Sequence, residues 1–222
     1  MRGILFASFG TSHRDAQESC LDAVTASLAR TDPEAIARQA YTSGMIRRVL
    51  ERRGEHVDDV RQALARMAVD GVTDLTVQPG HLLPGEEYDK LVRQVSGCAT
   101  LFGTVRVGEP LLATSEDMNR VVDIMAEQYP EQRESAVVLM GHGTSWFANV
   151  VYSAMNYRAQ TQGRPDIHVA CVEAEPTLDT VIGQLDASGY RRVRLAPLML
   201  VAGDHAKNDM AGTDGRSWAS RL

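Results

Sequence analysis

The chain has little of several features that mark common protein classes. It has three cysteines among 222 residues, and no CxxC or Cys/His ligand spacing links them, which argues against a zinc finger or a disulfide framework. No apolar stretch approaches the ~18–20 residues of a membrane span. The net charge of −6 argues against non-specific nucleic-acid binding, because that binding needs a basic surface. No GxGxxG, P-loop or GxSxG motif is present, so dinucleotide, triphosphate and serine-hydrolase sites lack their signatures.

The remaining composition is ordinary for a globular protein, with 44% hydrophobic and 23% charged residues. A length of 222 residues suits one large domain or two of about 100 residues. The pattern enters a strand at Gly3, which leaves no room for a signal peptide. We therefore expect a cytoplasmic protein with no membrane or nucleic-acid partner.

Apolar strands alternate with helical patterns along the whole chain. The expected strands span 3–9, 36–41, 72–77, 101–107, 136–140, 167–172 and 193–200. Longer helical patterns separate most of these strands, among them 115–129, about 147–161, and 177–187. This alternation predicts an α/β fold with doubly wound parallel sheets. The sequence Tyr-Pro-Glu at 129–131 is the expected boundary, which gives domains 1–128 and 129–222.

A pattern that occurs twice divides the chain into two similar halves. Residues 3–12 repeat the apolar run, the glycine and the Thr-Ser pair of residues 136–145, and Phe9 occupies the position of His142. The repeat predicts two doubly wound parallel-sheet halves that face each other across a cleft. The second half has no counterpart of the strand at 101–107 and is expected to be shortened.

The repeat also aligns two later segments. Pro79 and Pro197 are each followed by a glycine at the same spacing, so that Glu87 corresponds to His205. Glu87 would then come from the half that faces His205. Because it starts a helix, its charge would also be favourable there without any role in chemistry.

Three polar residues follow buried strands of the second half. His142 lies in a Gly-His-Gly turn, Glu173 follows the strand at 167–172, and His205 follows the strand at 193–200. The carboxyl ends of parallel strands open on one side of a sheet, where such folds bind ligands. Two histidines and a carboxylate suit a first-row divalent metal such as Co²⁺, Fe²⁺, Ni²⁺ or Zn²⁺.

Other polar residues have weaker claims to a site. Glu175 is close behind Glu173, and both could be solvated loop carboxylates. His81 lies on the turn after Pro79, where a ligand-binding role stays open. Asp209, four residues after His205, would orient that imidazole if a helix begins by then. The remaining histidines, His13, His56 and His168, are interpreted as surface or satisfied polar groups, and the cysteines Cys20, Cys98 and Cys171 as small buried hydrophobes.

At this point the chain resembles a known family. The Gly-His-Gly-Thr turn at 141–144, Val-Glu at 172–173 and the stretch 197–210 are similar to the anaerobic sirohydrochlorin cobaltochelatases of the CbiK type, class II chelatases with a ferrochelatase-like fold. Residues 9–12 and 85–88 agree as well. The resemblance implies insertion of Co²⁺ into sirohydrochlorin on the anaerobic route to cobalamin. It also implies that His142, Glu173 and His205 bind the metal, that the histidines accept pyrrole protons, and that Glu87 is the active-site glutamate.

The resemblance implies Co²⁺ as a substrate metal, with Fe²⁺ or Ni²⁺ as alternatives, and no organic cofactor. The expected partner is the tetrapyrrole sirohydrochlorin, and a homo-oligomer stays open. The family continues beyond the position of Leu222 with another strand and a helix, in keeping with a shortened second half. Two other functions remain: a sirohydrochlorin ferrochelatase for sirohaem synthesis, and a non-catalytic carrier of tetrapyrrole or metal.

Overall fold

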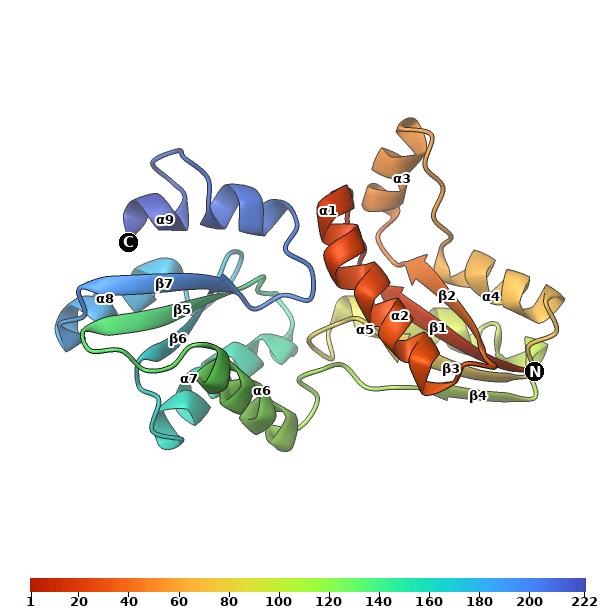
Figure 1. The fold of residues 1–222 in the computed structure, drawn as a ribbon, viewed down its shortest axis with the longest axis horizontal. Coiled ribbons are helices and arrows are strands. Elements are labelled where there is room, and N and C mark those ends of the chain that lie inside the picture. The colour runs from red at the N-terminus through yellow and green to blue at the C-terminus, as the bar shows by residue number, and fades with distance from the viewer. The chain divides into compact units, whose positions relative to one another are not determined.

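Four parallel strands form the first sheet of the computed structural model, which describes residues 1–222 (Figure 1). They are β1 (Arg2–Ser8), β2 (Ile36–Tyr41), β3 (Asp74–Pro79) and β4 (Thr104–Val107). The order across the sheet is β2-β1-β3-β4, so β1 has a neighbour on each side. Its run Leu5 to Ser8 is fully buried, as the continuous apolar pattern of this strand predicted.

The helices of this first unit connect its parallel strands. They are α1 (Arg14–Ala16), the π-helical turn η1 (Gln17–Asp22), α2 (Ala23–Thr31), α3 (Gly44–Arg52), α4 (Val60–Val69), α5 (Glu86–Ser96) and the 3₁₀ turn η2 (Ala99–Leu101). A capping box between Asp59 and Gln62 starts α4. Leu64 and Met67 of α4 pack with Leu5 of β1 in the core of the unit.

The second sheet has three parallel strands in the order β6-β5-β7. The elements of this unit are α6 (Ser115–Gln128), β5 (Ser135–Gly141), the 3₁₀ turn η3 (Phe147–Asn149), α7 (Val150–Thr161), β6 (Ile167–Cys171), α8 (Leu178–Ser188), β7 (Arg192–Pro197), the π-helical turn η4 (His205–Met210) and α9 (Trp218–Arg221). Val138 of β5, Val181 of α8 and Trp218 of α9 share one core cluster. In Figure 1, α6 and α7 lie on the side of this sheet away from α9.

The internal repeat is confirmed by the registers of the two sheets. Ala7 pairs with Pro79 in the first sheet, and Met140 pairs with Pro197 in the second. In each case the residue after the proline donates its N–H to the paired carbonyl at 2.7 Å. Because Ala7 corresponds to Met140, Phe9 corresponds to His142, as the sequence comparison had placed them. The fold class is therefore the predicted one, an α/β chain with two similar parallel sheets.

The division between the units falls at a different place from the predicted boundary at residues 128 and 129. The structure separates into Met1–Leu111 and Leu112–Leu222. Helix α6 accounts for the difference, because it packs against α7 of the second unit. The Tyr-Pro-Glu sequence at 129–131 resembled a linker, but the contacts of α6 assign this helix to the second unit.

Several element ends also differ from the prediction. The strand expected at 193–200 ends at Pro197, and the strand expected at 101–107 begins at Thr104 because Ala99–Leu101 forms a 3₁₀ turn. The two π-helical turns were not predicted, since their periodicity differs little from that of an α-helix over six residues. None of the helices combines the length and the apolar character needed to cross a membrane.

Candidate metal centre

His142, Glu173 and His205 come together at the carboxyl edge of the second sheet. His142 directly follows β5, Glu173 follows β6 by two residues, and His205 opens the π-helical turn η4 after β7. Each offers one ligand atom, and these atoms all lie within 4.8 Å of one another. We call these three residues the metal trio. The structure thus assembles the group that the strand ends predicted.

The trio is preorganised without being closed. The imidazole rings of His142 and His205 meet edge to face, with centroids 4.7 Å apart and planes at 85°. Bonds of about 2.0–2.2 Å to a tetrahedral ion would place ligand atoms roughly 3.4 Å apart, so small side-chain rotations suffice to bind one. About half of the His142 side chain and of the Glu173 side chain is exposed, so the site is open to solvent.

Hydrogen bonds set which ring nitrogen faces an ion. Nδ1 of His142 lies 2.9 Å from the carbonyl oxygen of Gly143, and Nδ1 of His205 lies 2.6 Å from Oδ2 of Asp209. Both oxygens accept, so each Nδ1 carries the proton and each Nε2 keeps its lone pair for a metal. The predicted contact of Asp209 with His205 is present, and it forms within the η4 turn.

The two loops that carry His142 and Glu173 are tied together. Glu173 donates its backbone N–H to the carbonyl of His142 at 2.9 Å. Gly143 has φ of +87°, and a Cβ there would lie 2.8 Å from the backbone nitrogen of Ala174. The ring of Tyr152 is buried against Gly141, just before the turn, and burial raises the pKa of its hydroxyl to about 12. The turn therefore has little freedom.

Asn149 provides a second link between these two loops, and the sequence analysis had not identified it as a site residue. Its Oδ1 accepts from the N–H of Thr144 at 3.0 Å, and its Nδ2 donates to the carbonyl of Glu175 at 2.6 Å. Glu175 accepts from the N–H of Thr177 through Oε2, so its carboxylate caps a turn instead of joining the trio. Asn149 falls inside the helix expected at about 147–161, and only the observed start of α7 at Val150 places it at the N-terminal end, where asparagine is favoured.

Glu87 lies in the first unit, in a polar cluster of its own. Its carboxylate accepts from the hydroxyl of Thr42 at 2.7 Å and from Nζ of Lys90 at 3.4 Å. Lys90 also donates to the carbonyl of Thr42 at 3.1 Å. Both ring nitrogens of His81 are buried without a hydrogen-bond partner. Burial lowers the pKa of His81 to about 4, and the charge of Glu87 opposes this effect.

Local contacts and burial account for three side chains that were interpreted as non-catalytic, those of His56, His168 and Cys171. Nε2 of His56 lies 3.0 Å from Asp58, and Nδ1 of His168 lies 3.3 Å from Gln184. Burial lowers the pKa of His168 and raises that of the Cys171 thiol to about 12, which makes Cys171 a small buried hydrophobe at neutral pH.

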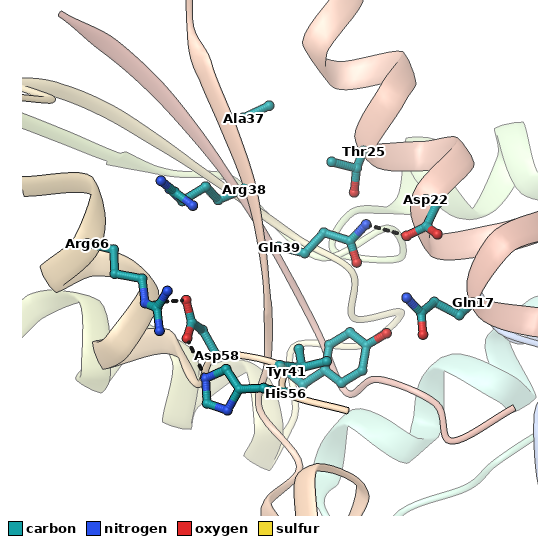
Figure 2. Close-up of a pocket in the computed structure, with 11 residues that line it drawn as sticks. Gln17, Asp22, Thr25, Ala37, Arg38, Gln39, Tyr41, His56, Asp58 and Arg66 are labelled. Atoms are coloured by element: carbon teal, nitrogen blue, oxygen red, sulfur yellow. Dashed lines mark hydrogen bonds and ion pairs between the residues drawn. The ribbon is translucent and has the colours of Figure 1, made fainter. Parts of the chain in front are cut away.

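A polar hollow of about 430 Å³ lies beside strand β2 in the first unit, which does not contain the metal trio, and Figure 2 shows the residues that line it. Its charged side chains are already paired: Asp58 with Arg66 and His56, and Arg38 with Asp70. Gln39 donates to Asp22 at 2.7 Å. None of the predicted site residues lies here, and the paired charges do not form a metal ligand set.

The fold and the metal trio together define an α/β protein of the chelatase fold. Among solved structures, SirB from Bacillus subtilis with Fe³⁺ has a similar fold, with a TM-score of 0.63 and 15% identity over 93% of this chain and 79% of that one. The cobalt chelatase (CbiK) family model matches residues 2–222, and the chain belongs to this family.

Two curated relatives span the whole of this chain. The sirohydrochlorin cobaltochelatase of Salmonella typhimurium is 39% identical over 223 residues, which cover 84% of its own length. The sirohydrochlorin cobaltochelatase CbiKC of Nitratidesulfovibrio vulgaris is 37% identical over 225 residues, which cover 79% of its length. The family inferred from the motifs is thereby confirmed.

Proposed function

We propose that this chain inserts Co²⁺ into sirohydrochlorin in anaerobic cobalamin biosynthesis. The observation that carries the proposal is the open trio of His142, Glu173 and His205 in a chain of the cobalt chelatase family. Two imidazoles and one carboxylate bind a first-row ion without enclosing it, so the ion can leave for the macrocycle. A cage of thiolates would hold a soft or borderline ion more firmly.

The reaction exchanges one divalent cation for two protons. As Co²⁺ leaves the trio, the lone pairs on Nε2 of His142 and His205 become free, and each imidazole accepts one proton from a pyrrole N–H. The total charge at the trio is then unchanged. A carboxylate lies near each imidazolium formed, Glu173 at 3.7 Å from His142 and Asp209 at 2.6 Å from His205.

We assign Glu87 to the same reaction as a carboxylate that acts on the tetrapyrrole. Its two partners, Thr42 and Lys90, hold the carboxylate in one orientation. Glu87→Gln keeps the side-chain shape and removes the charge. We expect it to lower turnover while leaving the affinity of the trio for Co²⁺ unchanged, as measured by equilibrium dialysis.

The test of the function follows sirohydrochlorin absorbance under anaerobic conditions with Co²⁺ and, separately, with Fe²⁺. We expect protein-dependent change over many turnovers, fastest with Co²⁺. His205→Ala should abolish it, and the matched control His56→Ala, a change in an exposed histidine of the first unit, should leave it intact. A faster rate with Fe²⁺ would instead favour sirohaem synthesis. Change that stops at one equivalent would favour a carrier.

A further inference from the structure

Two large aromatic side chains are exposed immediately after the histidine turn. Trp146 is 41% exposed and Phe147 is 86% exposed, and the neighbouring Val150 is 49% exposed. We call these three residues the aromatic patch. Single exposed apolar residues are common, but adjacent aromatic rings beside a polar site are typical of a surface that binds something. No contact described above uses their side chains.

The backbone of the patch is held in place beside the metal trio. Trp146 donates its N–H to the hydroxyl of Thr144 at 3.2 Å, and Asn149 links Thr144 to the carbonyl of Glu175. Trp146 is four residues from His142, so their Cα atoms are at most about 14 Å apart. The tied loops therefore fix an apolar surface within the reach of a large ligand bound at the trio.

We propose that the aromatic patch packs against one face of the sirohydrochlorin ring while the trio holds the metal. This inference rests on the proposed function. Metal transfer requires the centre of the ring to approach the trio, so the surface around the trio must meet the ring. The ring face is apolar and conjugated, and its charge lies on peripheral carboxylates. Trp146 and Phe147 match the face, since aromatic groups gain from stacking beyond the area they bury.

The main experiment compares steady-state kinetics of the whole protein with a double variant, Trp146→Ala with Phe147→Ala. We expect the KM for sirohydrochlorin to rise roughly tenfold, and the KM for Co²⁺ to stay unchanged. The conservative pair Trp146→Phe with Phe147→Tyr should retain the wild-type KM. Tyr157→Ala is the matched control, because Tyr157 is an aromatic residue of α7 that is 64% exposed and lies outside the patch.

A second measurement locates the ligand directly. The chain has two tryptophans, and Trp218 is only 6% exposed, so Trp218→Phe leaves Trp146 as the single tryptophan, whose fluorescence is excited selectively at wavelengths that tyrosine does not absorb. Acrylamide should quench Trp146 readily in the free protein. Bound sirohydrochlorin without metal should reduce the bimolecular quenching constant, obtained from fluorescence lifetimes so that energy transfer to the tetrapyrrole does not distort it.

The outcomes separate this inference from the proposed function. If the wild-type protein gives no turnover, the proposed function fails, and the metal-free binding of sirohydrochlorin to wild type and double variant still tests the patch. Equal KM or equal affinity in the two proteins would overturn the inference. So would a change confined to the KM for Co²⁺, which would mean that the loop only positions the trio. If acrylamide does not quench Trp146 in the free protein, other parts of the protein cover the patch, and the inference is overturned as well.

Discussion

His81 makes the stability of the first unit depend on pH in a direction that can be calculated. Its two ring nitrogens are buried and unpaired. Burial lowers its pKa to about 4, while a histidine in the unfolded chain has a pKa near 6.5. Between these values the unfolded chain binds a proton that the folded chain does not. The free energy of unfolding therefore falls as the pH falls through 6.5, and the loss is complete below about 4.

The size of the effect follows from the shift. The pKa of His81 differs by about 2.5 between the folded and the unfolded chain. This difference lowers the free energy of unfolding by about 3 kcal/mol in full, and by about 2 kcal/mol when the pH has fallen to 5. Glu87 and Lys90 are the charged groups that act on His81, and they oppose each other, so burial dominates. His81→Leu removes the titration and also removes two unpaired polar atoms. We expect this variant to be at least as stable as the wild type at pH 7.5.

Urea unfolding at a series of pH values, without metal, measures this dependence. Far-UV circular dichroism follows both units, whereas the fluorescence of Trp146 and Trp218 follows Leu112–Leu222 alone and provides an internal reference. Between pH 7.5 and 5 the wild type should lose about 2 kcal/mol more than His81→Leu in the transition of the first unit. Parallel pH curves for the two proteins would refute a buried neutral His81.

Two further predictions concern the metal trio. Gly143→Ala should lower the free energy of unfolding by more than about 1 kcal/mol and weaken Co²⁺ binding, because Gly143 has a positive φ and the new Cβ would contact Ala174. The control is Gly183→Ala, on the exposed face of α8, where no atom lies near the new Cβ. This variant should raise the free energy of unfolding by about 0.5–1 kcal/mol in the same urea assay. Asp209→Asn should reduce Co²⁺ affinity by about 10–100-fold in equilibrium dialysis with an unchanged circular dichroism spectrum, and equal affinity would exclude an orienting role.

The fold was accessible from the sequence because its signals are local. Apolar runs of strand length, separated by helical periodicity, identified every strand, and the repeat aligned Phe9 with His142 before the sheet registers confirmed it. The same strand ends predicted which polar residues meet at the second sheet. This works because the carboxyl ends of parallel strands share one edge, so the topology alone brings distant residues together.

Other features depend on contacts that no local pattern encodes. The observed boundary between the units lies before α6 and not after it, because α6 packs against α7, a contact between segments far apart in the sequence. The π-helical turn that brings Asp209 to His205, and the bridge from Asn149 to Glu175, depend on where neighbouring loops lie after folding. The isolation of the His81 ring nitrogens is likewise a property of the packed interior. The sequence by itself determined the sheets and the ligand types at their edges, and only the tertiary structure decided which atoms lie within reach of one another, because burial and hydrogen bonding are set by the whole fold.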